Sequence, residues 1–221
     1  MRRLVLCVEG ESEEAAAPAL VSRLWIGLPP ELQMGFVDSK PLRVKSVSIL
    51  TGRCSDKWKR YLQAASQRPN CGGVLLLLDA EVWEDDGGCA IEAARTLATE
   101  SVAVGGGKLF SVAVVLFRKE FESLLIASYP HLPGHRVSVV PPGTPELAPR
   151  DAKKWLKQNL EGGYKEKTDQ VILTRAINLE HLRKQNLHSF QRLEHAVLEL
   201  ATAMTTDQHI VSPRHPTPES S

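Results

Sequence analysis

The strongest constraint on the fold is an apolar run over residues 73–78 that ends in Asp79. A short run with no polar alternation is typical of a strand that is covered on both faces. We predict further strands over residues 4–8, 45–50 and 109–117. Strands of this kind are found mainly in parallel sheets, so we expect such a sheet with helices on both faces.

Helical stretches separate the predicted strands. The first should follow Ser12, whose hydroxyl can cap the helix, with Glu13 and Glu14 in the first turn. Pro18 predicts a kink or a late start in this helix. Three more helices are expected over residues 55–65, 89–100 and 120–128.

The pattern changes after residue 117. A proline-rich stretch covers residues 130–149, with an edge strand expected at 136–140, and helical periodicity then continues to about residue 204. We therefore expect an α/β core over residues 1–128 and a helical extension over 129–205 that completes the same domain as a C-terminal cap. Residues 206–221 are polar and proline-rich, and we expect a disordered tail outside the fold.

Composition narrows the classes of function. The chain has 221 residues and a formal net charge of +1, so it has no global positive field with which to hold a polyanion. The apolar stretch near the N-terminus is too short for a signal-peptide core or a membrane span, so we expect a cytoplasmic protein that does not enter a membrane. The four cysteines form no C-x-x-C pair and are interpreted as reduced structural thiols.

Acidic residues follow three of the predicted strands. Glu9 follows the first, Asp79 and Glu81 end the third, and Glu122 lies just after the fourth. Parallel strands present their carboxyl ends at one edge of the sheet, so these side chains should meet there. Oxygen ligands of this kind suit Mg²⁺ or Mn²⁺. Solvated or helix-capping carboxylates are the alternative interpretation, above all for Glu13.

The ordered segments VEGESE, LLLLDAE and FRKEFES, at residues 8–13, 75–81 and 117–123, resemble the Toprim domain of topoisomerases, primases and the OLD (overcoming lysogenization defect) nucleases. More closely, the chain is similar to a Toprim-like family of unknown function that is often encoded beside AAA-type ATPases in bacterial defence loci. The resemblance implies a Toprim-like parallel sheet flanked by helices, and a metal-dependent nuclease with an ATPase partner.

The resemblance also implies roles for individual residues. Glu9 corresponds to the Toprim glutamate, Asp79 and Glu81 to its D-x-D pair, and Glu13 and Glu122 to further acids of the nuclease branch. All five would be ligands of Mg²⁺ or Mn²⁺, and Glu9, Asp79 and Glu81 would also be catalytic. In this chain the second acid of D-x-D is a glutamate, which puts the metal geometry in doubt.

A nucleic-acid substrate also needs basic side chains along its backbone. We assign substrate binding to Lys153, Lys154, Lys167 and Arg53, and a catalytic role to Lys165. Lys57 and Arg60 form a second basic group beside a predicted helix start.

Two other signals carry no prediction of a site. Residues 105–108 lack the Ser or Thr and the following helix of a phosphate-binding loop. His181, His188 and His195 are spaced by seven residues, whereas histidines that share a metal on one helix are three or four apart.

The sequence therefore predicts a metal-dependent nuclease that acts on nucleic acid, with DNA favoured over RNA. A catalytically degenerate Toprim-like binding or regulatory subunit is the main alternative. A phosphohydrolase acting on nucleotides is a third interpretation, because acidic strand-end sites also serve small phosphoesters.

Overall fold

The computed structural model describes residues 1–51, 55–80, 87–146 and 151–214. In these residues a parallel sheet has the order β2-β1-β4-β5-β6, and β3 also pairs with β1. The strands are β1 (Arg2–Val8), β2 (Gly35–Val37), β3 (Leu42–Arg43), β4 (Cys71–Asp79), β5 (Ser111–Phe117) and β6 (Val211–Ser212). The predicted parallel sheet is confirmed.

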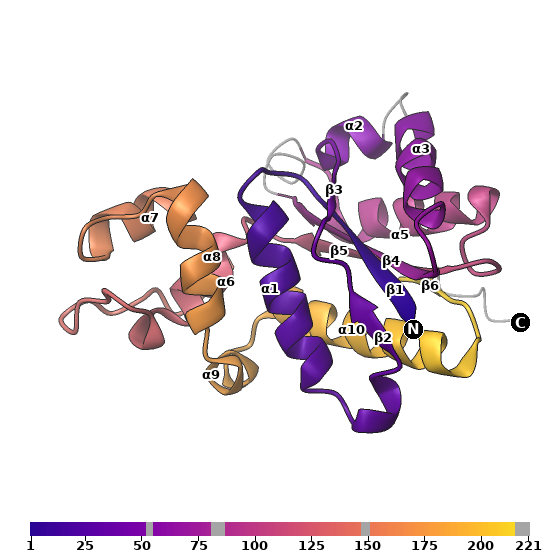
Figure 1. Ribbon diagram of the computed structural model, residues 1–221. Coiled ribbons are helices and arrows are strands. Elements are labelled where there is room, and N and C mark those ends of the chain that lie inside the picture. Colours follow the sequence, from indigo (N-terminus) through magenta and orange to yellow (C-terminus); the bar gives the residue numbers. More distant parts are fainter. Residues whose placement is uncertain (52–54, 81–86, 147–150, 215–221) are drawn as a thin grey trace, which may run out of the picture.

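Helices cover both faces of this sheet (Figure 1). Helices α1 (Glu13–Ile26) and α10 (His188–Thr206) pack on the face that carries Leu4, Leu6 and Val8. Helices α2 (Val47–Thr51), α3 (Ser55–Ser66) and α5 (Ala90–Ser101) pack on the face that carries Val5 and Cys7. The two faces of each central strand are thus buried in separate cores, which explains the unbroken apolar runs.

A helical lobe lies beyond α1, on the left in Figure 1. It contains α6 (Glu122–Ala127), α7 (Ala152–Asn159), α8 (Glu166–Ala176) and α9 (Leu179–Lys184), and α8 packs against α1. Tyr129 connects the 3₁₀ helix η3 (Tyr129–His131) to α7 within the lobe. Its hydroxyl donates a hydrogen bond to the Asn159 carbonyl at 2.6 Å, and its ring packs edge-on against Trp155. Further short 3₁₀ helices are η1 (Pro30–Leu32) and η2 (Val102–Val104). Within the described residues, no helix combines the length and the apolar character that a membrane crossing needs.

Two predicted strands are wrong. Most of residues 45–50 belong to α2. Val47 and Leu50 are both buried, and their spacing of three residues places them on one face of a helix. Residues 136–140 form no strand: Val137 and Val140 are largely exposed, and the nearby His135 makes only an isolated bridge to Leu160. The predicted helices over 55–65, 89–100 and 120–128 correspond to α3, α5 and α6.

The predicted start of α1 and the predicted tail also need correction. Ser12 already has helical dihedral angles and does not cap α1, and the helix begins at Glu13 and continues through Pro18. Residues 206–214 are not a disordered tail. Val211 and Ser212 extend the sheet beside β5, and the Ser212 hydroxyl donates to Glu199 of α10 at 2.6 Å. Residues 215–221 lie outside the described part.

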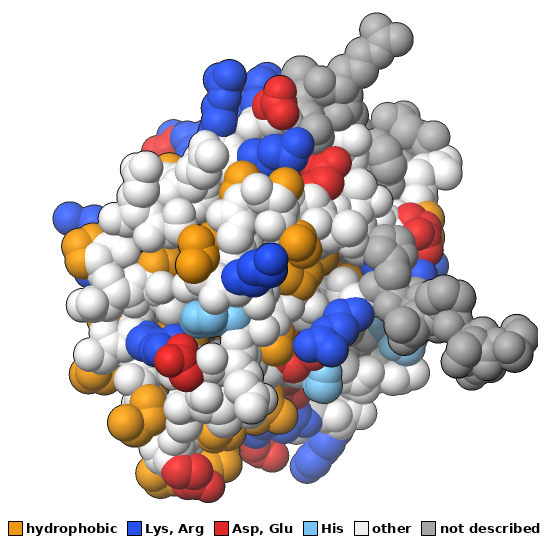
Figure 2. All heavy atoms as spheres, turned by 90° about the vertical axis from the view of Figure 1, so that its right-hand side faces the viewer, with side chains coloured by type: hydrophobic (Ala, Val, Ile, Leu, Met, Phe, Trp, Pro, Cys, Tyr) orange, Lys and Arg blue, Asp and Glu red, His pale blue; other side chains and the backbone are white. Residues whose placement is uncertain are grey.

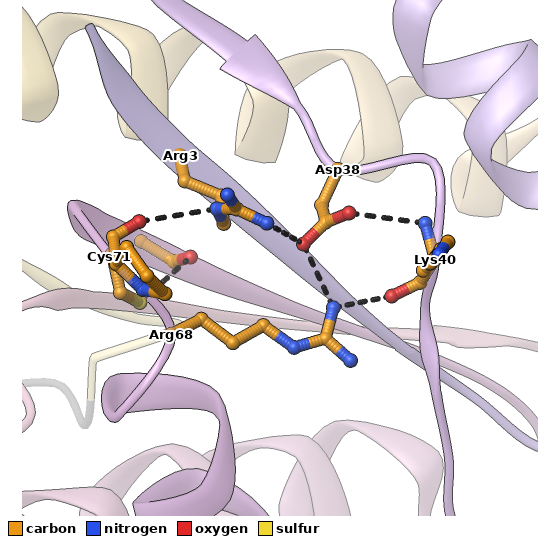
Figure 3. A network of polar contacts seen from close by, with 7 residues as sticks. Arg3, Asp38, Lys40, Arg68 and Cys71 are labelled. Carbon is orange, nitrogen blue, oxygen red and sulfur yellow. Dashed lines mark hydrogen bonds and ion pairs between the residues drawn. The ribbon is translucent and has the colours of Figure 1, made fainter.

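An ion-pair network joins β1 to the loop after β2 and to the turn before β4 (Figure 3). Asp38 Oδ2 accepts hydrogen bonds from Arg3 at 2.7 Å and Arg68 at 2.8 Å, and its side chain is only 7% exposed. Burial alone would raise the pKa of Asp38, but the hydrogen bonds from Arg3, the Lys40 backbone and Arg68 lower it below its ordinary value. The carboxylate therefore stabilises the fold in its charged form.

We expect Asp38→Asn to lower the free energy of unfolding by about 2 kcal/mol at pH 7, because it leaves two partly buried arginines without their anion. The pKa of Asp38 is lower in the folded protein than in the unfolded chain. The stabilisation by its carboxylate is therefore present above pH ~4 and is lost as the pH falls through the pKa of the folded protein. Urea unfolding at pH 7 and pH 3 measures both effects. Asp207→Asn, which breaks the exposed pair with Arg2, is the control and should change stability by less than about 1 kcal/mol. Equal losses in the two variants would contradict this account.

Candidate acidic site

A cleft of about 470 Å³ lies at the carboxyl ends of the central strands. It is lined by side chains that follow β1 and β4, by the start of α2, and by the first turns of α1, α7 and α8. The residues are Glu9, Gly10, Glu13, Ser46, Val47, Ser48, Asp79, Glu120, Lys153 and Glu166. Acidic residues after β1, β4 and β5 thus meet at one edge of the sheet.

Asp79 ties two of these strand ends together. Its Oδ1 accepts a hydrogen bond from the Phe121 backbone at 2.9 Å, which fixes the segment after β5 against the end of β4. Burial raises the pKa of Asp79 well above its ordinary value, and the neighbouring Glu122 and Glu13 raise it further. The Lys153 ammonium opposes this shift, so nearby positive charge favours the ionised form of Asp79.

Glu9 and Glu13 lie on either side of a close turn. A Cβ at Gly10 would meet Glu13 Oε2 at 2.1 Å, so a larger residue at this position would displace the Glu13 carboxylate. Burial raises the pKa of Glu9, the Glu13 carboxylate raises it further, and Lys153 partly opposes the shift. The Glu13 carboxylate is thus close enough to affect the ionisation of Glu9.

Glu122 is fully buried beside the cleft. Its Oε1 accepts hydrogen bonds from the Tyr164 hydroxyl at 2.9 Å and from Gln170 Nε2 at 3.1 Å. Burial raises the pKa of Glu122 to about 7; Lys153 lowers it and Glu120 raises it. The same Gln170 Nε2 donates to Glu13 Oε1 at 3.3 Å, so one amide links carboxylates from α1 and α6.

In the part of the chain that the structure describes, three buried oxygen atoms of this group have no hydrogen-bond partner. They are Glu13 Oε2, Glu122 Oε2 and Gln170 Oε1. Two of these acceptors are carboxylate oxygens. Mg²⁺ and Mn²⁺ bind oxygen ligands of this type. Within the described ranges, however, no three His, Cys, Asp or Glu side chains are arranged so that they alone could hold a metal ion. Glu81, the remaining predicted ligand, lies outside those ranges.

Lys153 supplies positive charge to the cleft. Its helix α7 is held in place by the Ala152 backbone, which donates to Glu120 at 3.0 Å, and by the Asp151 cap on Lys154 N at 2.7 Å. Lys153 Nζ lies 3.3 Å from Glu166 Oε1. Burial alone would lower the pKa of Lys153, but the surrounding carboxylates, led by Glu122 and Glu166, raise it overall. Lys153 is therefore an internal counter-charge for the acidic site.

The other predicted basic residues are not gathered at the cleft. Lys165, predicted as catalytic, is exposed and lines a separate pocket with Gly162 and Gly163, because it precedes α8 on the side away from the acids. Lys154 is exposed, and Lys167 forms an exposed pair with Glu11 at 3.0 Å. Lys57 and Arg60 are exposed on α3. Arg53 lies outside the described residues.

The sequence interpretation did not assign Glu120, Glu166, Tyr164 or Gln170 to the site. Gln170 carries a detectable signal, because it shares the buried face of α8 with Leu173 and Thr174 at spacings of three and four residues. A polar side chain on the buried face of a helix needs polar partners from elsewhere in the fold. The sequence does not reveal that those partners are Glu13 and Glu122.

A family model described as "Domain of unknown function (DUF4276)" matches residues 8–198. The chain belongs to this family. The match in this DUF4276 chain includes β2 to β5, the residues that line the acidic cleft and the helical lobe, so the two halves of the site are parts of one family unit. No curated protein and no solved structure matches the chain significantly.

We expect Lys153→Met to destabilise the metal-free protein by about 1 kcal/mol at pH 7. The reason is that the neighbouring carboxylates of the half-buried cleft lose the positive charge that balances them. Chemical unfolding in the presence of a chelator measures the effect. Lys154→Met is the matched control on the same helix turn and should leave the unfolding free energy unchanged. An equally stable Lys153→Met protein would show that the ammonium does not balance the acids.

Proposed function

We propose that this DUF4276 chain is a Toprim-type, metal-dependent nuclease that hydrolyses nucleic-acid phosphodiesters. The observation that carries the proposal is the convergence of Glu9, Glu13 and Asp79 on one cleft at the carboxyl edge of a parallel sheet, with Glu122 buried beside it. Such an edge is where open α/β sheets bind ligands. The proposed relation to Toprim domains and OLD nucleases is supported by the resemblance of three ordered acidic segments of the sequence.

The residues of the cleft have separable roles in this proposal. Glu9, Glu13, Asp79 and Glu122, together with Glu81, would hold Mg²⁺ or Mn²⁺ through oxygen atoms. A bound divalent cation would polarise the phosphate and lower the pKa of a bound water. The Lys153 ammonium, which the surrounding acids keep protonated, would face a phosphate oxygen and balance the charge that develops there.

Charge distribution supports a local contact with nucleic acid. Figure 2 shows the face that carries α3 and α5, where basic and acidic side chains are interspersed over the coloured part of the surface. That face offers no extended basic patch on which a polyanion could lie. Lys153 lines the cleft, and the exposed Lys154 and Lys167 are on the same two helices, α7 and α8; we assign these three residues to the substrate backbone.

The proposal extends to the cellular setting. By its resemblance to defence-associated Toprim-like chains, the protein would act in the cytoplasm as the effector of an anti-phage system with an AAA-type ATPase as partner. DNA is the preferred substrate to test, before RNA.

A catalytically degenerate binding or regulatory subunit is the second candidate, and one observation favours it. The Lys153 ammonium already lies among the acids, so the cleft has an internal cation. A site balanced in this way can persist without a metal. Titration with Mn²⁺ distinguishes the candidates, since the nuclease requires binding and the degenerate subunit does not.

The direct test is nicking of supercoiled plasmid by the purified full chain with Mg²⁺ or Mn²⁺. We expect Asp79→Asn and Glu9→Gln each to reduce the nicking rate by more than about 100-fold. This loss is larger than the one typically seen when a residue that only hydrogen-bonds to a metal ligand is removed. Both changes keep side-chain size while removing a charge that repels its neighbours, so the variants should remain folded.

Glu92→Gln is the control for this experiment, because Glu92 is exposed on α5 and pairs with Arg95 of the same helix. It should nick at the wild-type rate. Wild-type protein that neither nicks plasmid nor binds Mn²⁺, alone and with its partner ATPase, would refute the nuclease proposal.

A further inference from the structure

We infer that Gln170, a buried amide of the helical lobe, is a positioning residue that holds Glu13 and Glu122 in place for a divalent cation without adding a positive charge. This inference rests on the proposed metal-dependent function and extends it to a residue outside the Toprim-like segments. Gln170 belongs to α8, whereas Glu13 opens α1 and Glu122 opens α6.

The hydrogen bonds of Gln170 define the role. An amide nitrogen carries two N–H groups, and both are used here. One reaches Glu13 Oε1 at 3.3 Å and the other reaches Glu122 Oε1 at 3.1 Å. Each carboxylate thus has one oxygen fixed by the amide, while its Oε2 is buried and has no hydrogen-bond partner. Two oriented carboxylate oxygens remain available for a third group.

The chemistry of the amide explains why glutamine suits this place. Two neighbouring carboxylates need a donor between them to stay close. A lysine or arginine would supply that donor but would also neutralise the charge that attracts a cation. Glutamine bridges the pair without adding charge. The amide therefore holds the two carboxyl groups together and leaves their charge to be balanced by a cation with oxygen ligands.

Burial makes the arrangement selective. Gln170 and Glu122 have no exposed surface, and Glu13 is 8% exposed. Tyr164, from the loop before α8, donates to Glu122 on the same oxygen that Gln170 contacts. Gln170 Oε1 is itself buried without a partner, so it is a third oxygen in the same group that lacks a donor. A cation or a hydrogen-bond donor such as water satisfies such acceptors, whereas a buried anion or apolar ligand does not.

The test is Mn²⁺ binding measured by isothermal titration calorimetry on the full chain. Gln170→Met keeps the size of the side chain and removes both donors. We expect it to keep a cooperative thermal transition and to bind Mn²⁺ about tenfold or more weakly, as is typical when an outer-shell partner is lost. Thr174→Val is the matched control, because Thr174 is equally buried on the same helix and its hydroxyl has no partner. It should bind Mn²⁺ like the wild type.

Gln170→Glu provides a second readout that does not depend on the first variant folding well. It replaces the bridging donors with a third acid, so the metal-free protein should melt at a lower temperature and Mn²⁺ should raise its melting temperature more than that of the wild type. A folded Gln170→Met protein with wild-type Mn²⁺ affinity, or a Gln170→Glu protein with only the wild-type response, would overturn the positioning role and leave the proposed function intact. Wild-type protein that fails to bind Mn²⁺ would overturn both.

Discussion

Repulsion between carboxylates at one edge of the sheet is the constraint on which the rest of the site depends. Two carboxylates about 4 Å apart repel by roughly 4 kcal/mol at an effective dielectric of 20. This chain gathers acids from the ends of β1, β4 and β5 into one half-buried cleft. The fold must therefore supply positive charge or hydrogen-bond donors there, or the acids must take up protons.

The helical lobe meets that requirement. Lys153 on α7 supplies an ammonium group, and Tyr164 and Gln170 supply donors to Glu122. The lobe is itself held by the acids, because Glu120 accepts the Ala152 backbone and Glu166 accepts both the Ser12 hydroxyl and Lys153. The sheet and the lobe are thus coupled through the charged groups of the site. This coupling agrees with a DUF4276 match that includes both parts.

The parallel sheet could be predicted from the sequence because its evidence is local. The apolar runs that became β1, β4 and β5 show their two-sided burial directly, and parallel pairing then brings Glu9 and Asp79 to one edge. The short strands β2 and β3 carry no such run and were missed. Val47 and Leu50 fit a strand or a helix equally well by pattern, and only packing against α3 and α5 decides for α2.

The remainder of the site could not be predicted because it depends on contacts between distant parts of the chain. Nothing near Gln170 in the sequence indicates that Glu13 and Glu122 lie beside it. Lysines 153, 154, 165 and 167 look alike as a basic cluster, and the docking of α7 on Glu120 selects Lys153 alone to line the cleft. The sequence therefore predicted the acidic site residues better than the basic ones. The positions of the acids follow from the strands, whereas the positions of the bases follow from the packing of the lobe.

The central claim is that these acids form one cation site. The most direct measurement is the anomalous difference density of a crystal soaked in Mn²⁺ at neutral pH. This account predicts a peak in the cleft within coordination distance of Asp79 and of Glu9 or Glu13. A well-ordered cleft with no peak at millimolar Mn²⁺, in which Lys153 alone balances the carboxylates, would contradict it.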